Sequence, residues 1–60
     1  MKLKVGKYYI TRNFQTIKIE GKFQSGAVEV FYDRAGRFYF IDGVPTSGSV
    51  GDEFRIVGEL

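Results

Sequence analysis

Hydrophobic and polar residues alternate along most of this chain with a period of two, a pattern typical of β-strands. The clearest segment runs from Val28 to Ile41, where two β-branched and aromatic runs flank Asp33-Arg34-Ala35-Gly36. An Asp at the start and a Gly at the end favour a connection built on a type I turn, with a positive φ at Gly36. The pattern therefore predicts a β-hairpin over residues 28–41.

Bulky side chains fill both sets of alternate positions in this hairpin. In the first strand Val28, Val30 and Tyr32 alternate with Ala27, Glu29 and Phe31, and in the second Phe38 and Phe40 alternate with Arg37, Tyr39 and Ile41. A sheet with water on one side has one polar face. The hairpin is therefore either central to a closed barrel or covered by a second chain.

Two more strands are predicted on the N-terminal side of the hairpin. The first covers Leu3 to Thr11, with a bend or bulge at Gly6, and its alternation places Tyr8 and Ile10 on one face. The second covers Thr16 to Glu20 and returns antiparallel to the first.

The C-terminal part of the chain contains a polar loop followed by one more apolar segment. Val44 to Gly51 is rich in Gly and Ser and is the predicted mobile loop. Phe54 to Val57 is the predicted last strand, and Asp52-Glu53 alternatively begins a short helical turn. Five short strands without helical periodicity predict a single all-β domain over residues 1–60. We expect a small, strongly bent antiparallel sheet or a partly open barrel of the SH3 or OB size class.

Composition limits how such a domain can be stabilised. The chain has 60 residues, no Cys and no His, which excludes a structural zinc site or a disulfide, and we expect no metal and no cofactor. A domain of this size buries only about 60% of the surface of its unfolded chain. Because 17% of the residues are aromatic, a short sheet cannot cover every ring in one subunit, and we predict a homodimer.

Charge and hydropathy limit the classes of partner that the chain could bind. The formal net charge is +2, and the basic residues are scattered except for Lys2, Lys4 and Lys7. No apolar run approaches the ~20 residues of a membrane span, and the Met-Lys-Leu-Lys opening lacks the apolar core of a signal peptide. We therefore expect a cytoplasmic protein without a membrane partner.

The sequence favours binding over catalysis. Without His or Cys, acid–base chemistry would rest mainly on carboxylates, and the only adjacent acidic pair is Asp52-Glu53. Neighbouring residues on a strand point to opposite faces, so this pair would not converge on one substrate atom. We predict no enzymatic activity and no catalytic residues.

Aromatic residues interleaved with basic ones leave two interpretations open. Tyr9, Phe31, Arg37 and Tyr39 suit a platform that stacks the bases of a nucleic acid. The same rings alternatively form the core or a dimer contact. The dispersed basic residues favour the second interpretation.

Phe14 stands at the tip of the first predicted hairpin, where turn chemistry calls for Gly, Asn or Asp. A ring at that place is either an anchor for a partner or folded back onto Tyr8 or Phe23.

Residues 5–13, Val-Gly-Lys-Tyr-Tyr-Ile-Thr-Arg-Asn, resemble the opening of small β proteins encoded by phages and prophages, Val-Gly-Lys-Tyr-Tyr-x-Thr-Arg-Asp-Gly. Residues 33–38 and 52–59 are similar to two later segments of that family. This chain departs from the family in having Asn13-Phe14 in place of Asp-Gly and in lacking a Trp before the second turn. The resemblance implies phage origin and an intracellular role during infection, and it assigns no active residues.

The leading hypothesis is a phage-encoded, non-enzymatic interaction protein that binds and inhibits or redirects a bacterial host protein, such as an antiviral defence component. The predicted exposed contacts are Tyr9, Arg12, Phe14, Arg37 and Tyr39. The alternative is a nucleic-acid-binding barrel that uses Tyr9, Arg37 and Tyr39. A third hypothesis is capture of a small signalling nucleotide in a dimer cleft.

Overall fold

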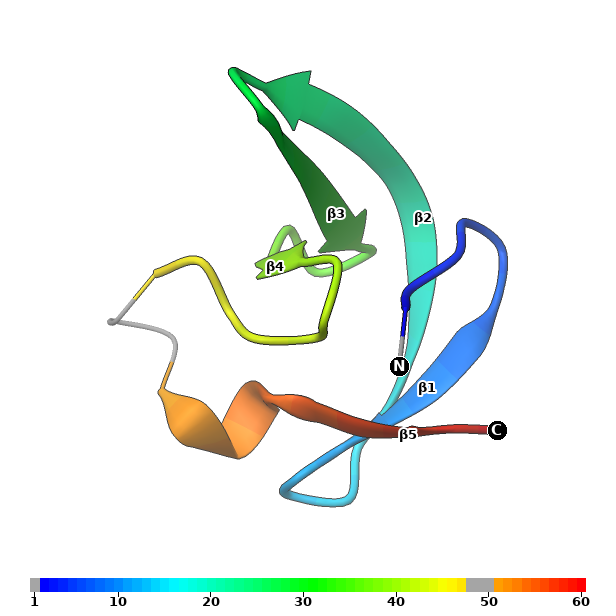
Figure 1. Ribbon diagram of the computed structural model, residues 1–60. Helices are drawn as coiled ribbons and strands as arrows, with labels where there is room; N and C mark the ends of the chain where they lie inside the picture. Colours follow the sequence, from blue (N-terminus) through cyan, green and yellow to red (C-terminus); the bar gives the residue numbers. More distant parts are fainter. Residues whose placement is uncertain (1, 48–50) are drawn as a thin grey trace.

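The computed structural model describes residues 2–47 and 51–60, and in this part of the chain it contains one five-stranded antiparallel sheet. Its elements are β1 (Tyr8–Thr11), β2 (Thr16–Ser25), β3 (Val28–Asp33), β4 (Phe38–Phe40), the 3-10 helix η1 (Asp52–Phe54) and β5 (Ile56–Glu59). The strand order is β4-β3-β2-β1-β5 (Figure 1). The predicted all-β fold and the hairpin over residues 28–41 are confirmed.

Strand β2 bends the sheet because it belongs to both halves. Its first residues pair with β1, and the rest pair with β3. The register shifts between Ile19 and Gly21, and an irregularity of this kind bends a strand; Figure 1 shows β2 curving between its two turns. Two backbone hydrogen bonds then draw the ends together, from Leu3 N–H to the Ile41 carbonyl (2.9 Å) and from Ile56 N–H to the Gly43 carbonyl (3.0 Å). The result is a small, partly open barrel.

The inner side of the bent sheet holds one small core. Its members come from the N-terminal segment and from all five strands: Leu3, Tyr9, Ile17, Ile19, Phe31, Tyr39 and Ile56. Burial of these side chains removes apolar surface from water, which is the main favourable term in folding.

The first strand differs from the prediction in length and in orientation. Gly6 (φ 88°) lies in a turn, and the strand begins only at Tyr8. Tyr9 and Thr11 point inward, whereas Tyr8 is 51% exposed. Thr11 is buried at little cost because its hydroxyl donates to the Gln15 carbonyl (3.2 Å) and accepts from the Gln15 N–H (3.0 Å). Tyr8 and Ile10 share one face, as the alternation predicted, and that face is the outer one.

The C-terminal part follows the alternative with a helical turn. Asp52 to Phe54 form η1, and the last strand starts at Ile56. In the predicted mobile loop Val44 to Gly51, Val44 to Thr46 pair with β4, since Phe40 N–H donates to the Val44 carbonyl (2.8 Å) and Thr46 N–H to the Phe38 carbonyl (3.1 Å). Residues 48–50 of that loop lie outside the described part. Within residues 2–47 and 51–60, no helix is long and apolar enough to cross a membrane.

Candidate partner-binding surface

The turn between β1 and β2 holds Phe14 in an unusual backbone conformation. Phe14 N–H donates to the Thr11 carbonyl (2.9 Å), and Thr11 N–H donates to the Gln15 carbonyl (2.9 Å). This pattern is a type I turn followed by a left-handed residue. Phe14 has φ 65° and occupies the left-handed position, and it is the only non-glycine residue with positive φ in the described part of the chain.

The turn between β3 and β4 repeats the same geometry with a glycine. Gly36 N–H donates to the Asp33 carbonyl (3.1 Å), and Asp33 N–H donates to the Arg37 carbonyl (3.1 Å). Asp33 Oδ1 accepts a hydrogen bond from the Arg37 N–H (3.0 Å), just as the Thr11 hydroxyl accepts one from the Gln15 N–H in the first turn. Gly36 has φ 86° and stands where Phe14 stands in the first turn. The left-handed position is thus occupied by Phe14 in the first turn and by Gly36 in the second.

The first turn is held rigidly by the C-terminal segment. Asn13 N–H donates to the Glu53 carbonyl (2.9 Å), and Arg12 N–H donates to the Arg55 carbonyl (2.8 Å). The Arg12 guanidinium also forms an ion pair with the Asp52 carboxylate on η1. The turn is therefore anchored through both its backbone and a side chain.

The Phe14 ring projects into solvent. It is 85% exposed, more than any other large hydrophobic residue described, so the alternative in which it folds back onto Tyr8 or Phe23 is wrong. Arg12 lies on the same turn and is exposed. The structure thus brings together two of the five predicted contacts, Arg12 and Phe14, on one rigid tip.

Two other predicted contacts are core residues. Tyr9 and Tyr39 are both 0% exposed, so their prediction as surface contacts was wrong. Each finds a partner for its hydroxyl inside the barrel: Tyr9 Oη accepts from the Lys4 N–H (2.8 Å), and Tyr39 Oη donates to Asp33 Oδ2 (2.8 Å). Phe31 is 1% exposed as well. The platform expected for nucleic-acid bases is therefore not on the surface.

The fifth predicted contact, Arg37, is engaged within the subunit. Its Nε lies 3.3 Å from both Tyr39 Oη and Asp33 Oδ2, and its guanidinium stacks 4.3 Å from the centre of the Phe54 ring. The hydrogen bond with Tyr39 raises the pKa of Arg37, and burial raises the pKa of Tyr39 to about 12. Asp33, Tyr39 and Arg37 thus form a network that holds the β3–β4 turn.

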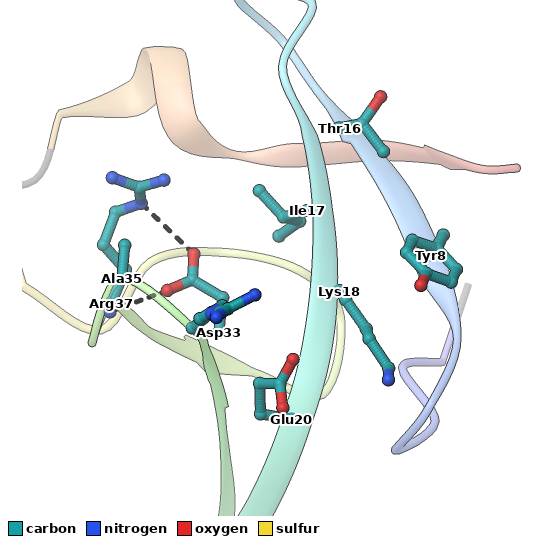
Figure 2. Close-up of a pocket in the computed structure, with 9 residues that line it drawn as sticks. Tyr8, Thr16, Ile17, Lys18, Glu20, Asp33, Ala35 and Arg37 are labelled. Atoms are coloured by element: carbon teal, nitrogen blue, oxygen red, sulfur yellow. Dashed lines mark hydrogen bonds and ion pairs between the residues drawn. The ribbon is translucent and has the colours of Figure 1, made fainter.

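A shallow pocket of about 300 Å³ lies between β2 and the β3–β4 turn. Its lining residues are Tyr8, Thr16, Ile17, Lys18, Glu20, Asp33, Arg34, Ala35 and Arg37. Figure 2 shows Asp33 beside the Arg37 side chain, with dashed lines marking the contacts between them. The lining mixes basic and acidic groups, and the Asp33 carboxylate already has protein partners. The pocket therefore indicates no particular class of ligand.

Four exposed rings were not among the predicted contacts, namely Tyr8, Phe23, Phe38 and Phe40. Phe23, Phe38 and Phe40 are 37% to 47% exposed. The signal for Phe38 and Phe40 was the apolar character of both hairpin faces, but the alternation alone did not tell which face closes over the core.

The described residues, 2–47 and 51–60, hold no group of three or more acidic side chains that could bind a metal ion. Comparison of the chain with protein-family models, with curated proteins and with solved structures gave no match.

Proposed function

We propose that this chain is a non-enzymatic interaction protein that binds another protein through the tip formed by Arg12 and Phe14. The observation that carries the proposal is an aromatic residue held at a left-handed turn position with its ring in solvent. The resemblance to phage proteins directs the search for the partner to the cytoplasm of a bacterial host, including its antiviral defence proteins.

Phe14 adds little to the stability of the free chain. A left-handed conformation costs an L-residue other than Gly roughly 1–2 kcal/mol. Burial of the ring recovers little of this cost, because the ring is 85% exposed. Gly36 shows that the same fold builds the same turn without a side chain at this position. Residues held in such conformations gather at functional sites, and binding is a function that the ring can serve.

The tip is suited to binding because it is ordered before a partner arrives. Its backbone is fixed by hydrogen bonds to the segment around η1. Within the tip, binding has to order only the side chains of Phe14 and Arg12, so the conformational part of the entropy cost is small. An aromatic ring beside an Arg is the composition of an interface hot spot. The complementary site is an apolar socket with hydrogen-bond acceptors at its rim.

The test uses two substitutions at one position. Phe14→Gly removes the ring and relieves the backbone, and Phe14→Tyr keeps a ring on the same backbone. Each variant and the unsubstituted chain serve as bait in a host lysate, and a protein retained by the unsubstituted chain is then purified and titrated by calorimetry. We expect saturable binding that Phe14→Tyr preserves and that Phe14→Gly weakens at least about 30-fold, as for a hot-spot residue.

The stability of the variants separates loss of binding from loss of folding. Phe14→Gly should unfold at the same urea concentration as the unsubstituted chain or a higher one. If no protein binds saturably, or if Phe14→Gly binds as tightly as the unsubstituted chain, the proposal is wrong. Titration with single-stranded oligonucleotides at low and high salt tests the nucleic-acid alternative, because phosphate contacts make the affinity fall steeply with salt.

A further inference from the structure

A second surface covers the outer side of β2, β3 and β4. Strand register places its members opposite one another, with Phe23 opposite Val30, Val30 opposite Phe40 and Tyr32 opposite Phe38. The outer face is defined here as Phe23, Val28, Val30, Tyr32, Phe38 and Phe40. These positions alternate with Phe31 and Tyr39, which point into the core.

The rings of the outer face form one cluster. The ring centres of Phe23 and Phe38 are 5.8 Å apart, edge to face, and Tyr32 lies 6.4 Å from each of them. Tyr32 also covers Gly21, where an added Cβ would lie 2.2 Å from the tyrosine oxygen. The side chains are thus ordered against one another, yet Phe23, Phe38 and Phe40 stay 37% to 47% exposed.

Near the turn between β2 and β3, the distribution of polar and apolar side chains over the two sides of the sheet is the reverse of that in the barrel. Lys22 shares the inner side with Phe31, and Gln24 shares it with Glu29, according to the register. An ion pair links Lys22 to Glu29 (3.3 Å). At this end the side continuous with the core is polar, and the outer side is apolar. An amphipathic ribbon of this kind needs cover from outside its own subunit.

We infer that the outer face is the interface of a homodimer, in which the outer faces of two copies pack against each other sheet on sheet. None of the side chains that the register places on this face carries a charge. Two copies therefore meet without burying an unpaired charge, which would be costly. Face-to-face packing of two sheets, about 10 Å apart, is the usual way to bury such a surface.

The area fits a reversible dimer. With 150–250 Å² for each ring, the exposed part of the outer face amounts to roughly 400 Å² per copy. Stable interfaces bury about 800 Å² per partner, and weak ones less than about 600 Å². An exposed apolar area of this size places the dimer among the weak interfaces. We expect a dissociation constant in the micromolar range or somewhat weaker.

Analytical ultracentrifugation of the full chain, from low micromolar to about 1 mM, tests the dimer directly. The unsubstituted chain should change from monomer to dimer over this range. The double variant Phe23→Thr, Phe38→Thr keeps strand-forming residues and should weaken association at least about tenfold. Tyr8→Thr, at a 51% exposed ring of β1 outside this face, is the matched control and should leave association unchanged.

Dilution of the unsubstituted chain gives a second readout that needs no variant. Chemical shifts in nuclear magnetic resonance spectra should move at the outer-face residues and not at Phe14 or β5. A chain that stays monomeric at about 1 mM, or dilution shifts confined to another surface, would overturn the inference. The inference is independent of the proposed function, because Phe14→Gly should weaken partner binding and leave the dimer intact.

Discussion

The hydroxyl of Tyr39 offers a quantitative test of the network that holds the β3–β4 turn. It donates to Asp33 Oδ2 (2.8 Å), and both residues are buried. A hydrogen bond to a charged group contributes about 1.5–3 kcal/mol. At neutral pH, Tyr39→Phe should therefore lower the free energy of unfolding by about 2 kcal/mol. The total free energy of unfolding of a domain of this size is roughly 3–9 kcal/mol.

The pH dependence follows from the pKa of the same hydroxyl. Burial raises the pKa of Tyr39 from its ordinary value of 10.0 to about 12, so the folded state favours the neutral phenol. The stabilisation is fully present below pH 10 and is lost as the pH rises from 10 to 12. Two pH units at 1.36 kcal/mol each amount to about 3 kcal/mol, of which about half is lost by pH 11.

Urea denaturation followed by circular dichroism, at several values between about pH 8 and pH 11, measures this loss. The difference between the unsubstituted chain and Tyr39→Phe should shrink as the pH rises, because only the former loses a neutral phenol. Tyr8→Phe, at an exposed ring, is the matched control for the loss of one phenol. A difference between the unsubstituted chain and Tyr39→Phe that stays constant with pH would refute the reasoning.

Three further predictions concern stability, and each is checked by urea denaturation. Gly43→Ala should lower the free energy of unfolding by about 1–3 kcal/mol more than Gly36→Ala does. Both glycines have positive φ, but only at Gly43 would the new Cβ meet the Ile56 Cβ, at 2.9 Å. Equal effects would mean that close packing at Gly43 is unimportant. Phe31→Ala should cost about 3–5 kcal/mol and leave much of the chain unfolded in water; a cooperative transition near that of the unsubstituted chain would contradict the assigned core. Arg12→Ala should cost less than about 1 kcal/mol, because its ion pair on η1 is exposed; a larger loss would show that the ion pair is needed to hold the tip.

The sequence predicted the central hairpin well because each of its features is local. Residues 28–41 alternate regularly, and Asp33 and Gly36 specify their own turn. The first strand was predicted less well, since adjacent tyrosines make its two faces look alike. The alternation did not tell that Tyr9 and Thr11 form the inner face, because hydropathy does not register that the Thr11 hydroxyl finds its partners within the turn.

In the candidate site, too, features set by local sequence were predicted and features set by distant contacts were not. Phe14 was identified from sequence because a ring conflicts with the local demand of a tight turn. The sequence offered the core as one interpretation of Tyr9 and Tyr39 but still placed both among the exposed contacts, because their burial depends on partners elsewhere in the fold, namely the Lys4 N–H and the Asp33 carboxylate. When both sets of alternate positions in a strand are apolar, the alternation does not tell which face is buried. The path of β2 decides which face closes over the core.

The two proposed surfaces lie at opposite ends of β2, and this separation has a consequence for binding. Phe14 comes just before the start of the strand, whereas Phe23 and its neighbours lie toward its far end (Figure 1). A dimer joined through the outer face therefore leaves both tips free, and it carries two Phe14 anchors. Two linked anchors raise the avidity for a partner that is itself dimeric or repeated. Variants of the outer face should thus leave the affinity for a single partner site unchanged and weaken capture only where two sites are engaged together.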